Sequence, residues 1–214
     1  MLRVYNFFWM IFTGKLGTAL WRLKMYRLGL DLSMVELDEL GLSPDIAKDH
    51  HTSGGPRLNR ILKKLAIAPG DKVMDLGCGK GGAIITLSRH FAQADGVDLS
   101  PNMVEIARDN LRKARVTNAR IFFGNAANFT DLDEYTHIYL SNPFPASVVR
   151  SVVQHAIESL QRRPRKMTLI YFIPAEEAVV VNMGLRKIRE FPHSEHAVTV
   201  YEFPASYYAA MLAS

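Results

Sequence analysis

The eight residues from Asp75 to Gly82 constrain the fold of this chain more than any other stretch: Asp-Leu-Gly-Cys-Gly-Lys-Gly-Gly. The residues just before, 72–76, have the pattern of a short strand, and residues 83–91 have that of a helix. Glycines at 77, 79 and 81 allow the chain to turn sharply between the two, and they allow a ligand to approach the backbone closely. The sequence therefore predicts a strand–turn–helix unit that binds a ligand.

Strand and helix patterns alternate through the rest of the chain, as they do in a parallel sheet covered on both faces. Only residues 192–196, which begin with Pro192-His193-Ser194, separate the last two strands. This connection is too short for a helical crossover and predicts an antiparallel pair. We therefore expect an α/β fold: a Rossmann-like three-layer α/β/α sandwich with an N-terminal helical segment. Its sheet has seven mostly parallel strands and an antiparallel last strand. The remaining strands are expected at 94–98, 120–123, 136–140, 167–172, 187–191 and 197–203, and the remaining helices at about 33–42, 56–65, 101–111, 147–161 and 175–185.

Two classes of ligand fit the glycine-rich stretch at this point. Gly77, Gly79 and Gly82 satisfy the G-x-G-x-x-G pattern of dinucleotide-binding proteins, so an oxidoreductase that uses a nicotinamide cofactor is one alternative. Asp75 argues against it, because dinucleotide folds usually have an apolar strand residue two positions before the first glycine. The position of the unit, about 70 residues into the chain, argues in the same direction.

The acidic residue followed by G-x-G-x-G resembles the first motif of class I S-adenosylmethionine-dependent methyltransferases. The resemblance covers about residues 52–203 and implies S-adenosylmethionine as the cofactor. It implies that Gly77, Gly79 and Gly81 hold the methionine part of that cofactor and that Asp75 accepts a hydrogen bond near its amino group. Asp98 follows Gly77 by 21 residues, where the family has an acidic residue that binds both ribose hydroxyls. A carboxylate suits two hydroxyl donors because it only accepts hydrogen bonds.

The same resemblance extends the predicted cofactor site along the next strands. Asn125 stands where the family commonly has an aspartate that binds the adenine amine, and its amide oxygen can accept that bond. The residues we assign to cofactor binding are Asp75, Gly77, Cys78, Gly79, Gly81, Asp98, Leu99, Asn125, Ala126 and Ser141. No metal site is expected.

The segment Asn142-Pro143-Phe144-Pro145 resembles the N-P-P-[YF] signature of methyltransferases that act on amino nitrogens. The resemblance implies that Asn142 and the carbonyl of Pro143 accept hydrogen bonds from the target N–H groups, while the ring of Phe144 packs on the target. The aromatic residue stands one position early, which argues against specific adenine recognition. We therefore expect direct in-line N-methylation of a protein or small-molecule amine. No general base is evident, although His50 and His51 are candidates.

Residues 1–30 form a distinct block with five basic side chains, no acidic ones and seven of the chain's 21 aromatic residues. The other 184 residues carry 21 basic and 21 acidic side chains, so the net charge of +5 comes from this block. We expect residues 1–50 to be a helical, basic and aromatic appendage, broken at Gly14 and Gly17 and packed on a methyltransferase domain at 51–214. Contact with a membrane surface is an alternative, and so is contact with nucleic acid, which is not favoured.

The composition of the chain indicates the cellular compartment in which the protein works. Cys78 is the single cysteine, which excludes a disulfide framework and a cysteine-based zinc cluster. No window has the ~20 uninterrupted apolar residues of a membrane-spanning helix. We therefore expect a cytoplasmic enzyme, with peripheral membrane association possible through residues 1–30. The nucleic-acid and membrane alternatives, like the oxidoreductase, stay open at this level.

Overall fold

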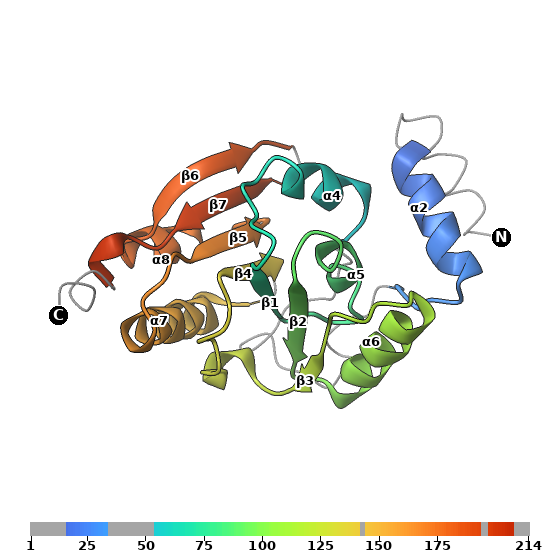
Figure 1. The fold of residues 1–214 in the computed structure, drawn as a ribbon, viewed down its shortest axis with the longest axis horizontal. Helices are drawn as coiled ribbons and strands as arrows, with labels where there is room; N and C mark the ends of the chain where they lie inside the picture. The colour runs from blue at the N-terminus through green and yellow to red at the C-terminus, as the bar shows by residue number, and fades with distance from the viewer. Residues whose placement is uncertain (1–15, 34–53, 142–143, 194–196, 208–214) are drawn as a thin grey trace.

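The computed structural model describes residues 16–33, 54–141, 144–193 and 197–207 (Figure 1). Its helices are α2 (Leu16–Arg27), α4 (Pro56–Leu62), α5 (Ile84–Leu87), α6 (Pro101–Lys113), α7 (Ala146–Arg162) and α8 (Glu177–Asn182), with short 3₁₀ turns η1 (Ala126–Asn128) and η2 (Ala205–Tyr207). Its strands are β1 (Lys72–Leu76), β2 (Gln93–Asp98), β3 (Ile121–Phe123), β4 (His137–Ser141), β5 (Thr168–Phe172), β6 (Arg186–Phe191) and β7 (Val198–Glu202).

These seven strands form one sheet in the order β3-β2-β1-β4-β5-β7-β6. All pairings from β3 across to β5 are parallel, whereas β7 runs antiparallel to both of its neighbours, β5 and β6. The prediction of a mostly parallel sheet with a reversed last strand is therefore confirmed. Because β1 lies at the centre, with β2 on one side and β4 on the other, the loops after these three strands lie at the same edge of the sheet.

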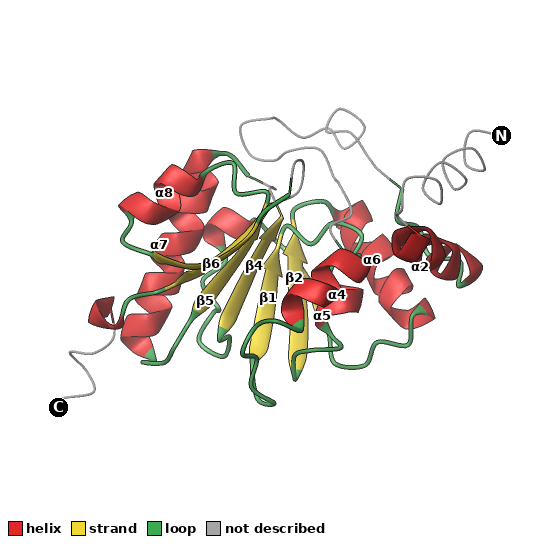
Figure 2. Ribbon diagram, turned by 90° about the horizontal axis from the view of Figure 1, so that it is seen from above, coloured by secondary structure: helices red, strands yellow, loops and turns green. Residues whose placement is uncertain are grey.

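Helices cover both faces of the sheet, as the alternating pattern predicts (Figure 2). On one face, α7 and α8 pack on a cluster that includes Met74, Leu140 and Leu169. On the other face, α4, α5 and α6 pack on a cluster that includes Val73 and Ile170. Neighbouring residues of one strand, such as Val73 and Met74, thus belong to opposite clusters, because successive side chains of a strand point to opposite faces.

Local sequence explains where several helices begin and end. Ser100 caps α6 with a side-chain oxygen that accepts the Met103 N–H, and Pro101 occupies the first helical position. The helix expected at 83–91 is shorter, because Arg89 and His90 donate their N–H groups to carbonyls only three residues back. The helix expected at 175–185 ends early, since Gly184 adopts a φ of 86° that terminates it.

The N-terminal segment differs from its prediction at one glycine. Gly17 is the second residue of α2 and does not break the helix. Met25 of α2 is buried in the same apolar cluster as α4, α5 and α6, and the ring of Trp21 lies against Gly55 at the start of α4. Gly14, the predicted helix at 33–42 and most of the predicted 1–50 appendage lie outside the described residues. The domain boundary at residue 50 stays a prediction.

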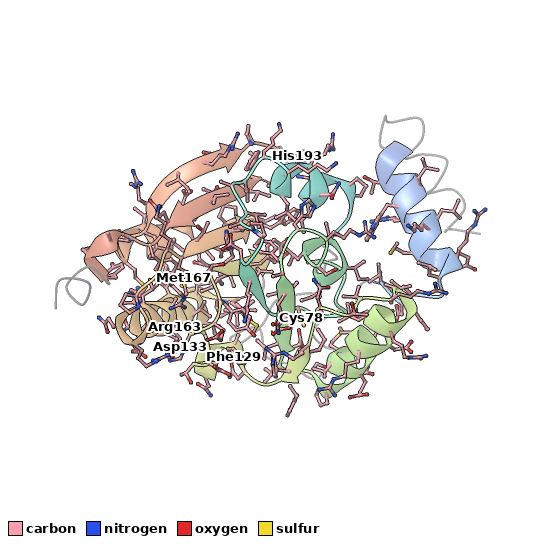
Figure 3. All side chains as sticks on the ribbon, in the orientation of Figure 1. Cys78, Phe129, Asp133, Arg163, Met167 and His193 are labelled. Carbon is pink, nitrogen blue, oxygen red and sulfur yellow. The ribbon has the colours of Figure 1, made fainter. Side chains whose placement is uncertain are left out.

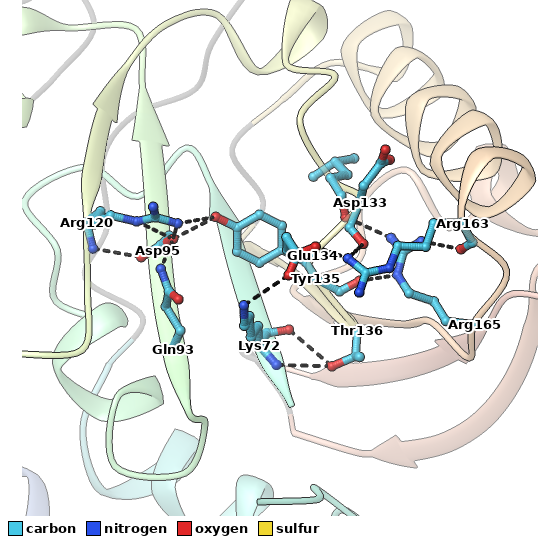
Figure 4. Close-up of polar contacts among 11 residues, drawn as sticks. Lys72, Gln93, Asp95, Arg120, Asp133, Glu134, Tyr135, Thr136, Arg163 and Arg165 are labelled. Carbon is cyan, nitrogen blue, oxygen red and sulfur yellow. Dashed lines mark hydrogen bonds and ion pairs between the residues drawn. The ribbon is translucent and has the colours of Figure 1, made fainter. Parts of the chain in front are cut away.

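The sheet also contains a fully buried carboxylate, that of Asp95, in the middle of β2 (Figure 4). Asp95 Oδ2 accepts hydrogen bonds from the Arg120 guanidinium, from the Tyr135 hydroxyl at 2.6 Å and from Gln93 at 2.7 Å. Its Oδ1 accepts the backbone N–H of Arg120 at 2.7 Å. The burial of this charge is therefore compensated on both oxygens.

Within the described ranges, the structure contains no helix that is both long enough and apolar enough to cross a membrane.

The imidazole of His137, at the start of β4, makes stability depend on pH. Burial lowers the pKa of His137 to about 4, against a smaller opposing effect of Asp71. The unfolded chain therefore binds a proton between about pH 6.5 and 4 that the folded chain does not bind. This group's contribution to the free energy of unfolding is expected to fall by about 1.4 kcal/mol per pH unit as the pH drops through that range. Urea denaturation of His137→Gln should show a flatter pH profile than the wild type, and parallel profiles would contradict the assignment.

Candidate active site

The predicted cofactor residues gather at one edge of the sheet, where the adjacent parallel strands β3, β2, β1 and β4 end. Asp98 is the last residue of β2 and Ser141 the last residue of β4, while Gly77 follows β1 directly. Cys78, within the turn after β1, lies near the middle of the molecule (Figure 3). This arrangement, with ligands at the carboxyl ends of neighbouring strands, is the usual position of a site in an open α/β sheet.

The glycine turn after β1 has a backbone that requires glycine. Gly77, Gly79 and Gly81 have φ values of 79°, 52° and 76°, all in the left-handed region. A Cβ on Gly81 would stand 3.3 Å from the Cβ of Ala107 on α6, so this glycine also allows the turn to pack on that helix. These three positions therefore carry no side chain that would keep a ligand away from the backbone.

Asp98 is tied to this turn and to the start of α6. Its Oδ2 accepts the Gly79 N–H at 2.8 Å and its Oδ1 accepts the Ser100 N–H at 3.0 Å. Burial raises the pKa of Asp98, while backbone hydrogen bonds from Ser100, Gly79 and Leu99 oppose the shift. Each carboxylate oxygen keeps a further lone pair for a hydroxyl donor. The carboxylate is therefore oriented by the protein and still able to bind two hydroxyls.

Asp75 is buried in β1 at 1% exposure, and its Oδ1 has no hydrogen-bond partner among the described residues. Burial raises the pKa of Asp75 well above its usual value, and the charge of Asp98 adds to the shift. An unpartnered buried acceptor is unfavourable unless a ligand or water supplies a donor. These two carboxylate acceptors beside a glycine turn fit a ligand that carries an amino group and vicinal hydroxyls.

Cys78 lies within the turn and is buried. Burial, followed by the charges of Asp75 and Asp98, raises the pKa of the Cys78 thiol well above its usual value. A thiol held in its neutral form is a poor nucleophile. A Cβ on Gly96 would stand 2.7 Å from the Cys78 Cβ, so Cys78 packs closely on β2.

Three more of the residues assigned to cofactor binding follow β3 or β2. Asn125 follows β3 and its Oδ1 accepts the Ala127 N–H at 2.9 Å, so this side chain caps η1. The amide oxygen retains one lone pair for a ligand. Ala126 is buried at the start of η1, while Leu99, directly after Asp98, is half-buried.

The predicted acceptor motif is described only in part. Asn142 and Pro143 lie outside the described residues, as do His50 and His51. Phe144 is 7% exposed and belongs to the apolar cluster between the sheet and α7. A role in which its ring stacks on the acceptor would require the ring to leave this cluster.

No role for Lys80, which lies inside the glycine turn, is evident from the sequence. Its ammonium is buried and pairs with Asp31, after α2, at 2.8 Å. One sequence signal marks Asp31, since it is the first acidic residue of the chain. Nothing in the sequence indicates that these two residues, 49 positions apart, are in contact.

The chain is similar in sequence and in fold to known methyltransferases. Residues 73–166 match a family described as a methyltransferase domain. A probable cobalt-precorrin-6B C(15)-methyltransferase (decarboxylating) from Methanococcus vannielii is 26% identical over 127 residues, covering 59% of this chain and 67% of that protein. A 23S rRNA (uracil(1939)-C(5))-methyltransferase from Francisella tularensis is 21% identical over 178 residues, covering 77% of this chain and 39% of that protein. The structure of an RNA methyltransferase from Salinibacter ruber in complex with S-adenosyl-L-homocysteine has a TM-score of 0.57 and 20% identity, covering 70% of this chain and 91% of that one.

The strand order, the glycine turn after β1 and the family match define a Rossmann-like methyltransferase. The chain is a class I S-adenosylmethionine-dependent methyltransferase, and S-adenosylmethionine is its cofactor. The family match favours this cofactor over the nicotinamide alternative left open by Gly77, Gly79 and Gly82. Over the part of the chain that the structure describes, no group of three or more His, Cys, Asp or Glu side chains is placed to hold a metal ion.

Proposed function

We propose that the carboxyl edge of the sheet binds S-adenosylmethionine across the ends of β1, β2, β3 and β4. The glycine turn would receive the methionine part, Asp75 would accept a donor near its amino group, and Asp98 would accept the two ribose hydroxyls. The unpartnered Oδ1 of Asp75 is the observation that supports this proposal most directly. The residues assigned are Asp75, Gly77, Cys78, Gly79, Gly81, Asp98, Leu99, Asn125, Ala126 and Ser141.

For the reaction, we propose methyl transfer to the nitrogen of a protein or small-molecule amine. The cofactor supplies a methyl group that is already activated by its sulfonium. The protein therefore has to orient the acceptor in line with that methyl and to exclude water. Asn142 and the Pro143 carbonyl would accept hydrogen bonds from the acceptor N–H groups, so that the nitrogen lone pair faces the methyl and the nitrogen then loses a proton.

The position of Ser141 supports this role for the segment that follows it. Ser141 ends β4, which is the direct neighbour of β1 in the sheet. Asn142 is thus the next residue along the chain from the edge at which the glycine turn lies. An acceptor bound here would be close to a methyl group held by the turn.

Asn142→Ala is expected to lower the rate of methyl transfer without weakening cofactor binding. The variant should bind S-adenosylhomocysteine as the wild type does, because the cofactor residues are unchanged. Methyl transfer to an amine acceptor should fall by about 10²-fold or more, as expected when an orienting hydrogen bond is lost. Isothermal titration with S-adenosylhomocysteine and a radiolabelled methyl-transfer assay against a panel of amines would measure the two effects. Unchanged transfer by the variant would contradict the proposed acceptor site.

A nucleic-acid acceptor is a second candidate, which one surface favours. Residues 54–70 contain Arg57, Arg60, Lys63 and Lys64 and no acidic residue. Burial, followed by the charges of Lys63 and Arg89, lowers the pKa of His90, so Lys63 and Arg89 both lie near this imidazole. Two of the relatives are named as RNA methyltransferases. RNA binding that weakens steeply with salt would favour this candidate over an amine acceptor.

The membrane-surface alternative rests on residues 1–30, of which only 16–30 are described, and it stays a prediction. So does the cytoplasmic location. Liposome co-sedimentation of the full chain and of a chain lacking residues 1–30 would test the membrane alternative.

A further inference from the structure

Four polar side chains join the N-terminal segment to the glycine turn: Asp31, Ser33, Lys80 and Asn110, here called the Asp31 cluster. Lys80 Nζ donates to Asp31 Oδ2 at 2.8 Å and to Ser33 Oγ at 2.7 Å. Ser33 Oγ donates in turn to Asp31 Oδ1 at 2.7 Å. Ammonium, hydroxyl and carboxylate thus close a ring of hydrogen bonds, and its lysine is the residue between Gly79 and Gly81.

Asn110, from α6, fixes the backbone on both sides of this ring. Its Oδ1 accepts the Asp31 N–H at 2.9 Å, and its Nδ2 donates to the carbonyls of Asp31 at 2.8 Å and Lys80 at 2.9 Å. The Asn110 residue is 1% exposed. One buried amide therefore holds the segment after α2 and the glycine turn at a defined spacing.

The conformation of the glycine turn depends on the Asp31 carboxylate, because this carboxylate compensates the charge of Lys80. The Lys80 side chain is 3% exposed, whereas that of Asp31 is 49% exposed. A buried ammonium is stable only while a partner compensates its charge. Burial alone would raise the pKa of Asp31, but hydrogen bonds from Lys80 and Ser33 lower it to about 2. Asp31 therefore remains ionised at neutral pH, and without it Lys80 would have to move toward water and carry the turn with it.

We propose that Asp31 is a positioning residue for the cofactor site, which holds the peptide units of Gly79 and Gly81 in their ligand-binding conformation through Lys80. This inference rests on the proposed binding of the cofactor at the turn. Gly79 also donates its N–H to Asp98, so a displacement of Lys80 reaches the residue assigned to the ribose. It follows that the cofactor site includes residues before position 50, and that any partner which moves the N-terminal segment changes cofactor affinity.

Isothermal titration of the full chain with S-adenosylhomocysteine tests the role of Asp31. Asp31→Asn is expected to weaken binding by about tenfold, a typical size for coupling between neighbouring sites. Asp31→Glu keeps the charge and should recover most of the affinity. Glu202→Gln is the matched control, because it also removes a carboxylate from an ion pair, with Arg186 on β6. Unchanged binding by a folded Asp31→Asn variant would overturn the proposal, even if its melting temperature were lower.

Amide hydrogen exchange on the wild type supplies a second measurement, which decides the matter if Asp31→Asn fails to fold. The amides of Asp31 and Ser33 donate within the Asp31 cluster and report on it directly. S-adenosylhomocysteine should slow the exchange of both, together with the amides of the turn. Slowed exchange in the turn alone would overturn the inference and leave the proposed function intact. A wild-type chain that fails to bind the ligand would instead contradict the proposed function.

Discussion

Replacing Asp98 by alanine is expected to weaken the binding of S-adenosylhomocysteine by roughly a hundredfold. The substitution removes two hydrogen bonds from ribose hydroxyls to an ionised acceptor, each contributing about 1.5 kcal/mol to the binding free energy. The carboxylate is already oriented by the N–H groups of Gly79 and Ser100, so little of its binding energy is spent on ordering the side chain. Isothermal titration of the purified variant measures this loss.

Two further variants separate this effect from a general loss of structure. Asp98→Asn retains one carbonyl acceptor and should lose less affinity than Asp98→Ala. Glu105→Gln, on the exposed surface of α6 and paired with Arg108, is the matched control and should bind as the wild type does. If Asp98→Ala folds and binds the ligand normally, Asp98 is not the ribose acceptor.

Asp75→Asn is expected to make the ligand-free protein more stable and the cofactor site weaker. The substitution removes a buried charge that has no partner on Oδ1 and lies near Asp98. The gain at neutral pH is expected to be about 1–3 kcal/mol of unfolding free energy. Loss of a charged acceptor should weaken S-adenosylhomocysteine binding by roughly 10- to 100-fold. Urea denaturation and titration calorimetry on the same samples would measure both.

The sign of the pH dependence follows from the raised pKa of Asp75. In the ligand-free protein, the folded state holds this proton to a higher pH than the unfolded state does. The stabilisation is therefore complete below the unfolded pKa of about 4 and is lost as the pH rises through the folded pKa. Asp75→Asn should remove this loss, so its advantage over the wild type should grow with pH. An advantage that stays constant with pH would contradict the burial of an ionisable, unpartnered Asp75.

Asp95 provides the matched comparison, since it is a second buried aspartate on the neighbouring strand. Its two oxygens accept hydrogen bonds from Arg120, Tyr135 and Gln93 (Figure 4). Asp95→Asn should therefore destabilise the protein, because it breaks a compensated network and leaves Arg120 without its carboxylate. Opposite effects of the same substitution at positions 75 and 95 would distinguish an acceptor kept for a ligand from one that holds the fold.

The sequence predicts the central strands and the glycine turn well, for identifiable reasons. Residues 72–76 form β1 at the predicted bounds, and Ser100-Pro101 begin α6 as capping chemistry requires. Asp75 and Asp98 come to one edge because the strands that carry them are parallel neighbours. Periodicity and short motifs depend on residues close together in the chain. They therefore predict β1, the start of α6 and the glycine turn, which are determined by such residues.

Features that depend on tertiary contacts are the ones that the sequence does not predict. The Asp31 cluster joins residues 31, 33, 80 and 110, and no spacing in the chain relates them. The burial of Phe144 depends likewise on α7 packing against the sheet. Gly17 was expected to break a helix, yet helix propensity at one glycine is a small cost that surrounding packing overrides. The role of residues 142 and 143 in acceptor binding stays a prediction.

Titration of the wild-type chain with S-adenosylhomocysteine, with NAD as the comparison ligand, tests whether the carboxyl edge of the sheet binds S-adenosylmethionine. We expect saturable binding of one S-adenosylhomocysteine per chain, strongly reduced in Asp98→Ala, and no binding of NAD. A correctly folded wild type that ignores S-adenosylhomocysteine, or that binds NAD at the same site, would contradict this proposal.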